Sequence, residues 1–290
     1  MTRAVERPSP GQRLGGALRL MHPFPSAMNA LAVLLFASLA TGGWPGWGVA
    51  ARLAATTFAA HASIGIANDL VDRDLDRATK PHKPLVAGVV TPAAALGLLA
   101  LALAVAGLGA ASFGPVSLAC VAGVVGAGLL YDFRLKRTPL SWLPYLLALP
   151  LQPIWVWAAL GRFTPRLLWV YPLGAAPLLA LHLANALADV AGDTVAEVGG
   201  LVQRLGARRA RALLWPAALL PGALALLLGL ALPYRWGRFL PALALSLAPT
   251  LAAMALVRRR PGDEAVYRTV FGLLIVSTIV LAVGWLAAAI

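Results

Sequence analysis

Residues 92–112 read PAAALGLLALALAVAGLGAAS, a stretch of 21 residues without a single charged side chain. A hydrocarbon core about 30 Å thick is crossed by roughly 20 apolar residues in a helix. Similar apolar stretches recur along the chain, with Gly and Pro scattered through them. The expected spans are residues 22–42, 47–67, 92–112, 115–131, 139–160, 167–187, 210–232, 238–257 and 266–289. The sequence therefore predicts an all-α polytopic membrane protein, a bundle of nine transmembrane helices.

The composition of the whole chain points the same way. Of its 290 residues, 60% are hydrophobic and 12% are charged, and the mean hydropathy is +0.80. A soluble domain has roughly 45–50% apolar and about 25% charged residues, so an ordinary soluble class is excluded. The one cysteine, Cys120, excludes a disulfide framework and a cysteine-based metal cluster. We expect residues 1–290 to form a single membrane domain, with residues 1–21 as a cytoplasmic N-terminal tail.

The basic residues are unevenly distributed between the connections. With the N-terminus in the cytoplasm, 19 of the 24 Lys and Arg residues lie on the cytoplasmic side, together with all 11 acidic residues. The positive-inside rule thus predicts a cytoplasmic N-terminus and a cytoplasmic active site. We expect a multi-pass protein of the plasma membrane. It also accounts for the net charge of +13 without nucleic acid as a partner.

Carboxylates gather where the second expected span ends. The sequence from Asn68 reads NDLVDRDLD, which places Asn68, Asp72 and Asp76 at intervals of four residues. On a continuous helix these three lie within about 80° of one face. Asp69 falls just beyond this arc, whereas Asp74 points away from it. Because carboxylates near a bilayer are costly, such a group is functional by default.

The same spacing recurs 117 residues further along the chain. The sequence from Asn185 reads NALADVAGD and places Asn185, Asp189 and Asp193 at intervals of four. Oxygen ligands of this kind suit Mg²⁺, which binds one or two carboxylates together with substrate phosphates. Two such clusters facing one another are suited to two Mg²⁺ ions on a diphosphate. Basic side chains near them are candidates for the remaining phosphate oxygens: Lys80, Lys83, Arg134, Lys136 and Arg137.

These motifs resemble those of the UbiA superfamily of intramembrane prenyltransferases. NDLVDRDLDRATKPHKPLVAG, from Asn68, resembles the first aspartate-rich motif of that family. NALADVAGD and the following GGLVQRLG resemble the second motif, and YDFRLKRTP, from Tyr131, resembles the element between them. The resemblance implies Mg²⁺ as cofactor and an isoprenyl diphosphate as donor. By match, it implies metal-binding and catalytic roles for Asp72, Asp76, Asp189 and Asp193, supported by Asn68, Asn185 and Asp69, with Tyr131 as a further functional residue.

Polar residues inside the spans are candidates for the acceptor pocket. His182 lies three residues before Asn185, and His61 lies seven before Asn68. Either could line the pocket or accept a proton, and either could instead bond to a neighbouring helix. The same two alternatives apply to Asn29 and Gln152, deep in the first and fifth expected spans.

The resemblance implies prenyl transfer to a lipophilic acceptor within the bilayer. An aromatic ring on the way to a quinone is the first expectation. Alternatives are a glycerol-phosphate lipid, haem or a tetrapyrrole acid, and more distantly an isoprenoid cyclase or transfer of a sugar phosphate. A rival from another class is an ion-coupled transporter, but transporter sites lie near the bilayer midplane on broken helices. Carboxylates at helix ends beside basic connections fit a phosphate substrate better.

Overall fold

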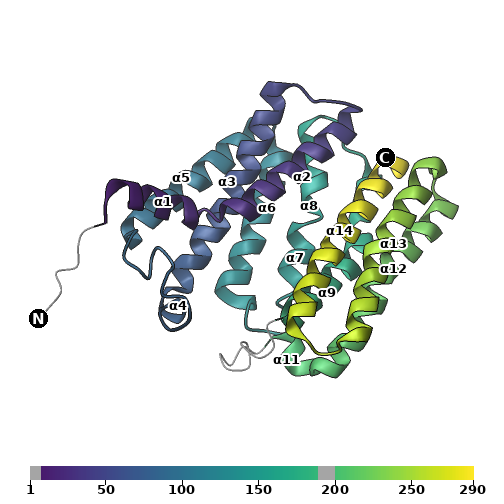
Figure 1. Cartoon of the computed structure of the whole chain (residues 1–290). Helices are drawn as coiled ribbons and strands as arrows, with labels where there is room; N and C mark the ends of the chain where they lie inside the picture. The colour runs from purple at the N-terminus through teal and green to yellow at the C-terminus, as the bar shows by residue number, and fades with distance from the viewer. Residues whose placement is uncertain (1–7, 189–199) are drawn as a thin grey trace, which may run out of the picture. The chain divides into compact units, whose positions relative to one another are not determined.

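The computed structural model describes residues 8–188 and 200–290 (Figure 1). Every regular element in these ranges is helical, which confirms the predicted all-α fold. The elements are α1 (Pro10–Leu20), α2 (Pro23–Thr41), α3 (Trp47–Val71), α4 (Arg73–Thr79), α5 (Pro92–Ala111), α6 (Pro115–Leu130), η1 (Tyr131–Leu135), α7 (Leu143–Ala148), α8 (Leu151–Ala159), η2 (Pro165–Trp169), α9 (Val170–Ala188), α11 (Leu201–Leu205), α12 (Ala207–Ala231), α13 (Trp236–Arg259) and α14 (Glu264–Ala289).

Within the described ranges, eight helices are long and apolar enough to cross a membrane. They correspond to eight of the nine expected spans, with ends that differ by a few residues. The fifth expected span, 139–160, is instead divided between α7 and α8. Pro150 and Pro153 lack the N–H groups that a continuous helix would use here, so the helix breaks between Ala148 and Leu151.

The chain divides into two compact units. The first unit contains α1 to α6 and α8, and the second contains α7, α9 and α11 to α14. In the first unit α3 packs against α2, α5 and α6. Small residues permit this close packing: a Cβ on Gly109 of α5 would lie 2.2 Å from Oγ1 of Thr56 on α3.

The second unit is built around α9, which packs against α12 and α14, while α13 packs along α14. Its buried core is formed by alanine and leucine side chains of α9 together with Leu214, Tyr267, Val270 and Leu274. Thr250 and Ser277 join α13 to α14 through a hydroxyl contact of 2.8 Å. Both ends of that contact are buried, so polar groups between these spans are satisfied within the protein.

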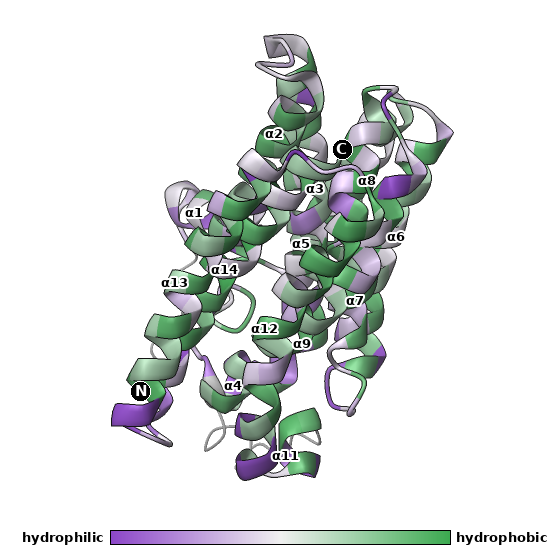
Figure 2. Ribbon diagram, turned by 90° about the vertical axis from the view of Figure 1, so that its right-hand side faces the viewer, coloured by the Kyte–Doolittle hydropathy of each residue, from purple (hydrophilic) through white to green (hydrophobic). Residues whose placement is uncertain are grey.

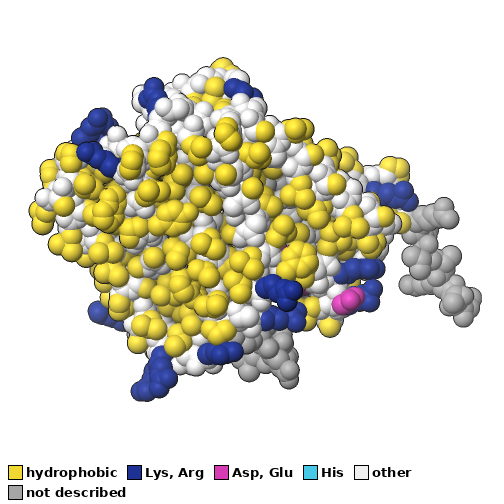
Figure 3. Space-filling model, turned by 180° about the vertical axis from the view of Figure 1, so that it is seen from behind, with side chains coloured by type: hydrophobic (Ala, Val, Ile, Leu, Met, Phe, Trp, Pro, Cys, Tyr) yellow, Lys and Arg dark blue, Asp and Glu magenta, His cyan; other side chains and the backbone are white. Residues whose placement is uncertain are grey.

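The outward faces of the long helices are apolar. Figure 2 shows hydrophobic residues along the helices of both units, and in Figure 3 hydrophobic side chains cover most of the visible face. Leu101 and Leu108 of α5 are 59% and 75% exposed, and Leu230 of α12 is 81% exposed. On helices that are long and apolar enough to cross a membrane, a continuous apolar surface of this kind is expected to face lipid.

Candidate active site

The first aspartate-rich motif lies where α3 passes into α4. The backbone N–H of Asp72 donates to the carbonyl of Asn68 (2.9 Å), and that of Asp76 donates to the carbonyl of Asp72 (2.8 Å). The helical spacing assumed from the sequence therefore holds through the motif. Asp69, Asp72 and Asp76 are buried. The side chain of Asp74 is 86% exposed, so it points away from them as predicted.

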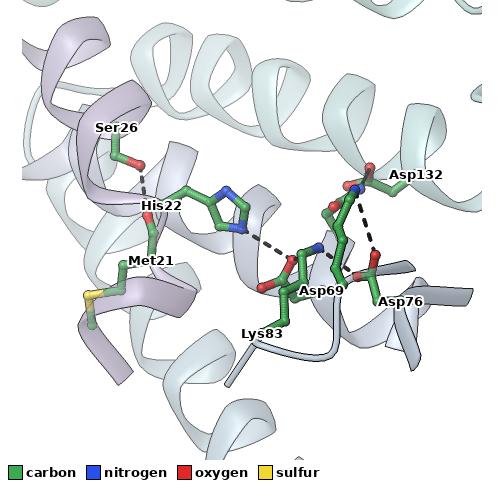
Figure 4. Close-up of polar contacts among 9 residues, drawn as sticks. Met21, His22, Ser26, Asp69, Asp76, Lys83 and Asp132 are labelled. Carbon is green, nitrogen blue, oxygen red and sulfur yellow. Dashed lines mark hydrogen bonds and ion pairs between the residues drawn. The ribbon is translucent and has the colours of Figure 1, made fainter. Parts of the chain in front are cut away.

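Lys83 bridges two of the buried carboxylates. Its Nζ donates to Oδ1 of Asp69 (2.7 Å) and to Oδ2 of Asp76 (2.6 Å), as Figure 4 shows. Burial alone would lower the pKa of Lys83, but its hydrogen bonds to the two carboxylates outweigh this effect and raise the pKa. The ammonium group thus stays charged at neutral pH. The sequence suggested Lys83 as one of the candidate phosphate ligands but did not indicate this bridging position.

His22 approaches the same cluster from the connection between α1 and α2. Its Nε2 lies 3.3 Å from Oδ1 of Asp69 (Figure 4). Its backbone has φ +46°, a left-handed conformation that is uncommon outside glycine. The ring is seated on Gly65 of α3, where a Cβ would lie 2.6 Å from Cδ2 of His22. Sequence reasoning missed His22, because no motif links it to the end of α3.

Asp132 adds a further carboxylate, also missed from the sequence. The amide Nδ2 of Asn68 donates to Oδ1 of Asp132 (2.7 Å). Asp132 lies in η1, a π-helical turn that continues α6, and such turns are frequent at functional sites. One turn earlier a Cβ on Gly128 would lie 2.5 Å from Cδ1 of Ile64, so α6 approaches α3 closely there. The sequence did offer one indication of Asp132: it directly follows Tyr131 in the segment YDFRLKRTP, which resembles a family element.

The other predicted phosphate ligands lie nearer solvent. The side chain of Lys80 is 56% exposed, and its Nζ lies 3.7 Å from Oδ1 of Asp76. Tyr131 is partly buried at the start of η1. In the second unit, Arg134 and Arg137 are exposed and Lys136 is partly buried. Of the expected basic set, the structure brings Lys80 and Lys83 to the first motif.

On the second-motif side, the described part ends within α9. Asn185 is exposed, and His182 lies one turn before it. Nε2 of His182 is 3.0 Å from Oγ of Ser141, and its ring lies 6.2 Å from that of Tyr145. Asp189 and Asp193 lie outside the described residues.

A second polar cluster in the first unit joins α2, α3 and α8, about two turns before the first motif along α3. Gln152 of α8 donates from Nε2 to Oδ1 of Asn29 on α2 (2.7 Å), and the same Nε2 is 3.5 Å from Nε2 of His61 on α3. Nδ2 of Asn29 donates to the carbonyl of Pro25 (2.9 Å). The sequence suggested each residue separately, but the structure joins them across three helices.

The donor set at the end of α3 fits a hard divalent cation. The oxygens of Asp69 and Asp76 already share one positive charge, the ammonium group of Lys83, and Asp72 lies one helical turn from Asp76. Carboxylate and amide oxygens are the ligands that Mg²⁺ prefers. Within the described ranges, no three His, Cys, Asp or Glu side chains already converge on a single metal position.

The fold and this site define an integral membrane protein with a carboxylate cluster at the end of a span. Residues 29–277 match the model of the UbiA prenyltransferase family. The matched region includes the first motif and the segment of the second. The chain therefore belongs to the UbiA prenyltransferase family.

The comparisons with individual proteins agree with this family. The chain is 30% identical over 185 residues to a protoheme IX farnesyltransferase of Thermus thermophilus. That match covers 62% of this chain but only 28% of the relative.

Two solved structures have a similar fold over most of both chains. One is described as digeranylgeranylglyceryl phosphate synthase (TM-score 0.77, 16% identity, 96% of this chain and 98% of the other). The other is a UbiA homologue from Archaeoglobus fulgidus bound to GPP and Mg²⁺ (TM-score 0.69, 21% identity, 94% and 99%). At these identities the likeness shows the fold.

Proposed function

We propose that the protein transfers an isoprenyl group from an isoprenyl diphosphate to a lipophilic acceptor within the membrane, with Mg²⁺ as cofactor. The observation that carries the proposal is the buried cluster of Asp69, Asp76 and Lys83 at the end of α3. It lies in the first aspartate-rich motif of a family of prenyltransferases. The Archaeoglobus homologue, which has this fold, was solved with GPP and Mg²⁺.

Different residues are proposed to bind the metal ion, stabilise the diphosphate and bind the donor. Asp72 and Asp76 of the first motif would hold a Mg²⁺ ion, with Asn68 and Asp69 beside them, and Asp189 and Asp193 of the second motif are expected to do the same. The bound ion supplies positive charge to the diphosphate as it departs. Lys80 and Lys83 add positive charge on the same side. Further candidates for donor binding are Asn185 of the second motif and three basic residues, Arg134, Lys136 and Arg137.

The reaction requires mainly that the protein stabilises the charge of the leaving diphosphate and excludes water. The allylic C–O bond breaks and the diphosphate leaves with the electron pair, so the protein must stabilise a developing negative charge. The carbocation is then captured by an electron-rich carbon or a hydroxyl of the acceptor, which loses a proton. Spans with apolar surroundings exclude the water that would otherwise capture it. Tyr131, beside Asp132 in η1, is the candidate for orienting the donor at this end.

Haem is the acceptor to test first. The relative that is 30% identical over 185 residues is a protoheme IX farnesyltransferase. An aromatic ring of the quinone type is the second candidate. His182 and Asn29, considered separately, are candidates for contact with the acceptor. The likeness to the phosphate-lipid synthase is one of fold at 16% identity and does not favour a lipid acceptor.

We further propose that the site opens to the cytoplasm from the plasma membrane. The support is the charge asymmetry, with 19 of 24 basic residues on the side of the acidic motifs. Impermeant labelling of single cysteines in intact cells tests it. A cysteine at Asp74 should react only after the cells are opened, and reaction in intact cells would reverse the orientation.

The test of the proposed function is binding and ionisation of a labelled donor by the purified, detergent-solubilised full chain. Geranyl, farnesyl and geranylgeranyl diphosphate are each offered with Mg²⁺ and with EDTA. We expect metal-dependent binding and release of diphosphate with at least one of them, followed by transfer in a screen that includes haem. Folded protein that binds none of the three in either condition would contradict the proposal and favour a transporter.

A further inference from the structure

Helix α1 has one face packed against the protein. Gly16 and Leu20 are buried, and a Cβ on Gly16 would lie 2.8 Å from Cγ1 of Val89 and 3.0 Å from Cγ2 of Val90. The helix is well defined at its start, because Ser9 and Gln12 form a capping box and Pro10 occupies the first helical position. It is therefore a docked element of the first unit.

The opposite face of α1 is apolar and uncovered. Leu14 is 65% exposed and Leu18, one turn later, is 51% exposed. At 100° per residue, Gly16 points about 180° away from the midpoint of these two leucines, so packing and exposure fall on opposite sides. Single exposed leucines are normal, but two that are adjacent on one short helix form a continuous stripe.

Two arginines flank this stripe. Arg13 and Arg19 lie about 120° to either side of its midpoint, and both are exposed. The sequence of the helix, PGQRLGGALRL, contains no acidic residue. Arginine can extend its charged end to a headgroup while its stem lies along apolar surface. An apolar stripe between two arginines is the pattern of a helix that lies in the membrane interface.

The position of α1 supports lipid as its partner. With 11 residues it is about 16 Å long, too short to span a bilayer. It ends two residues before α2, a candidate span whose first turns expose Phe24 (77%) and Leu31 (58%). Two leucines are far less than the roughly 800 Å² per partner of a stable protein interface. The uncovered leucines of α1 thus lie directly before a candidate span that itself exposes apolar side chains.

We propose that α1 binds the interface of a bilayer containing anionic lipid, with Leu14 and Leu18 in the boundary of the acyl chains and Arg13 and Arg19 on the headgroup phosphates. This binding surface is separate from the proposed catalytic site, and its test does not depend on catalysis.

The test is nitroxide accessibility in the full chain reconstituted into vesicles. Labels are placed by Leu14→Cys and Leu18→Cys in a Cys120→Ala background. Two references are exposed in the structure: Asp74→Cys on α4 for water, and Leu101→Cys on α5 for lipid. Collisions with oxygen and with a water-soluble nickel chelate are measured in phosphatidylcholine vesicles with and without phosphatidylglycerol. Thermal unfolding of each labelled variant checks that it is folded.

We expect labels at positions 14 and 18 to collide freely with oxygen, and severalfold less with nickel than the label at position 74 does. Phosphatidylglycerol should lower the nickel collisions further, and Arg13→Gln with Arg19→Gln should remove that additional decrease. Nickel collisions equal to those at position 74 would show that the face is in water. Low collisions with both reagents would show protein contact, such as a second copy of the chain. An identical result in both vesicle types would overturn the role of anionic lipid.

Discussion

Helix α3 carries two polar clusters that differ in charge. At its end, Asp69 and Asp76 share the ammonium group of Lys83, and Asn68 bonds to Asp132. Two turns earlier, His61 lies beside a pair of neutral amides, Gln152 and Asn29. Both clusters are buried or partly buried in the same unit, yet one contains ions and the other contains dipoles.

The difference follows from the cost of charge in a membrane. An ionised carboxylate at depth is expensive, whereas neutral amides and imidazoles between helices bond to one another at little net cost. The charged cluster can therefore exist only where internal cations and the end of the span support it. The comparison therefore favours the proposal that cations and phosphate bind at the end of α3, and that the polar residues in its middle pair helices or contact a neutral acceptor.

The largest effect is expected from Asp72→Asn. The amide keeps the size of the carboxylate but removes its charge. Under the proposed function, Mg²⁺ would lose a ligand and the diphosphate would lose charge stabilisation. We expect transfer to fall by about 10²–10³-fold or more, the size seen when one group that stabilises developing charge is removed. Steady-state transfer from labelled donor, with thermal unfolding as a folding check, measures it. By the repeated motif, Asp189→Asn should have a similar effect.

Asp74→Asn is the matched control for this change. It removes the same charge from the same motif, two residues away, at a side chain that is 86% exposed and paired with Arg77 on the surface. Transfer should stay close to that of the wild type. A large loss with Asp74→Asn would mean that charge in the motif matters irrespective of its direction. Near-normal transfer with Asp72→Asn would contradict the proposed role of Asp72.

Lys83→Met should cause the largest loss of stability. It leaves two buried carboxylates without the cation between them, and breaking a buried ion pair in this way costs about 3–5 kcal/mol. We expect a clear fall in the Tm of the detergent-solubilised protein, part of which Mg²⁺ restores. The control is Lys80→Met, because Lys80 is mostly exposed and its pairing with Asp76 is worth about 0–1 kcal/mol. Equal losses from both variants would argue against the bridging role.

The sequence predicted the spans and the first motif because both depend on local pattern. Apolar length located eight of the long helices, and the four-residue spacing placed Asp72 and Asp76 correctly along the helix. His22 was not predictable, because it joins the motif through the packing of other elements onto α3. Asp132 had a local signal in its place beside Tyr131, but its contact with Asn68 depends on the packing of α6 onto α3. The break in the fifth expected span had a local cause in Pro150 and Pro153, which apolar length alone did not reveal.

Gly128→Val tests whether the close approach of α6 to α3 positions Asp132 beside Asn68. A side chain here would collide with Ile64, which lies one turn before Asn68 just as Gly128 lies one turn before Asp132. Overpacking of this kind costs about 1–3 kcal/mol, so we expect a lower Tm and weaker donor binding. Ile64→Ala in the same chain should restore part of both.

Gly126→Val is the control on the same helix. It makes the same change in helix propensity, but a Cβ there meets nothing within 4 Å. If both valine variants behave alike, the effect comes from the helix backbone and the close approach to Ile64 is unimportant.

The smallest stability effect is expected from Gln152→Leu in the neutral cluster. It removes the hydrogen bond to Asn29 and the contact with His61, and interhelical bonds of this kind average about 0.6 kcal/mol with a maximum near 1.7 kcal/mol. The Tm should therefore fall less than with Lys83→Met, and the affinity for the donor should not change. A rise in the KM for the acceptor alone would show that the cluster contacts the acceptor, while unchanged kinetics would restrict it to pairing helices. A loss of donor binding would contradict the division of roles along α3.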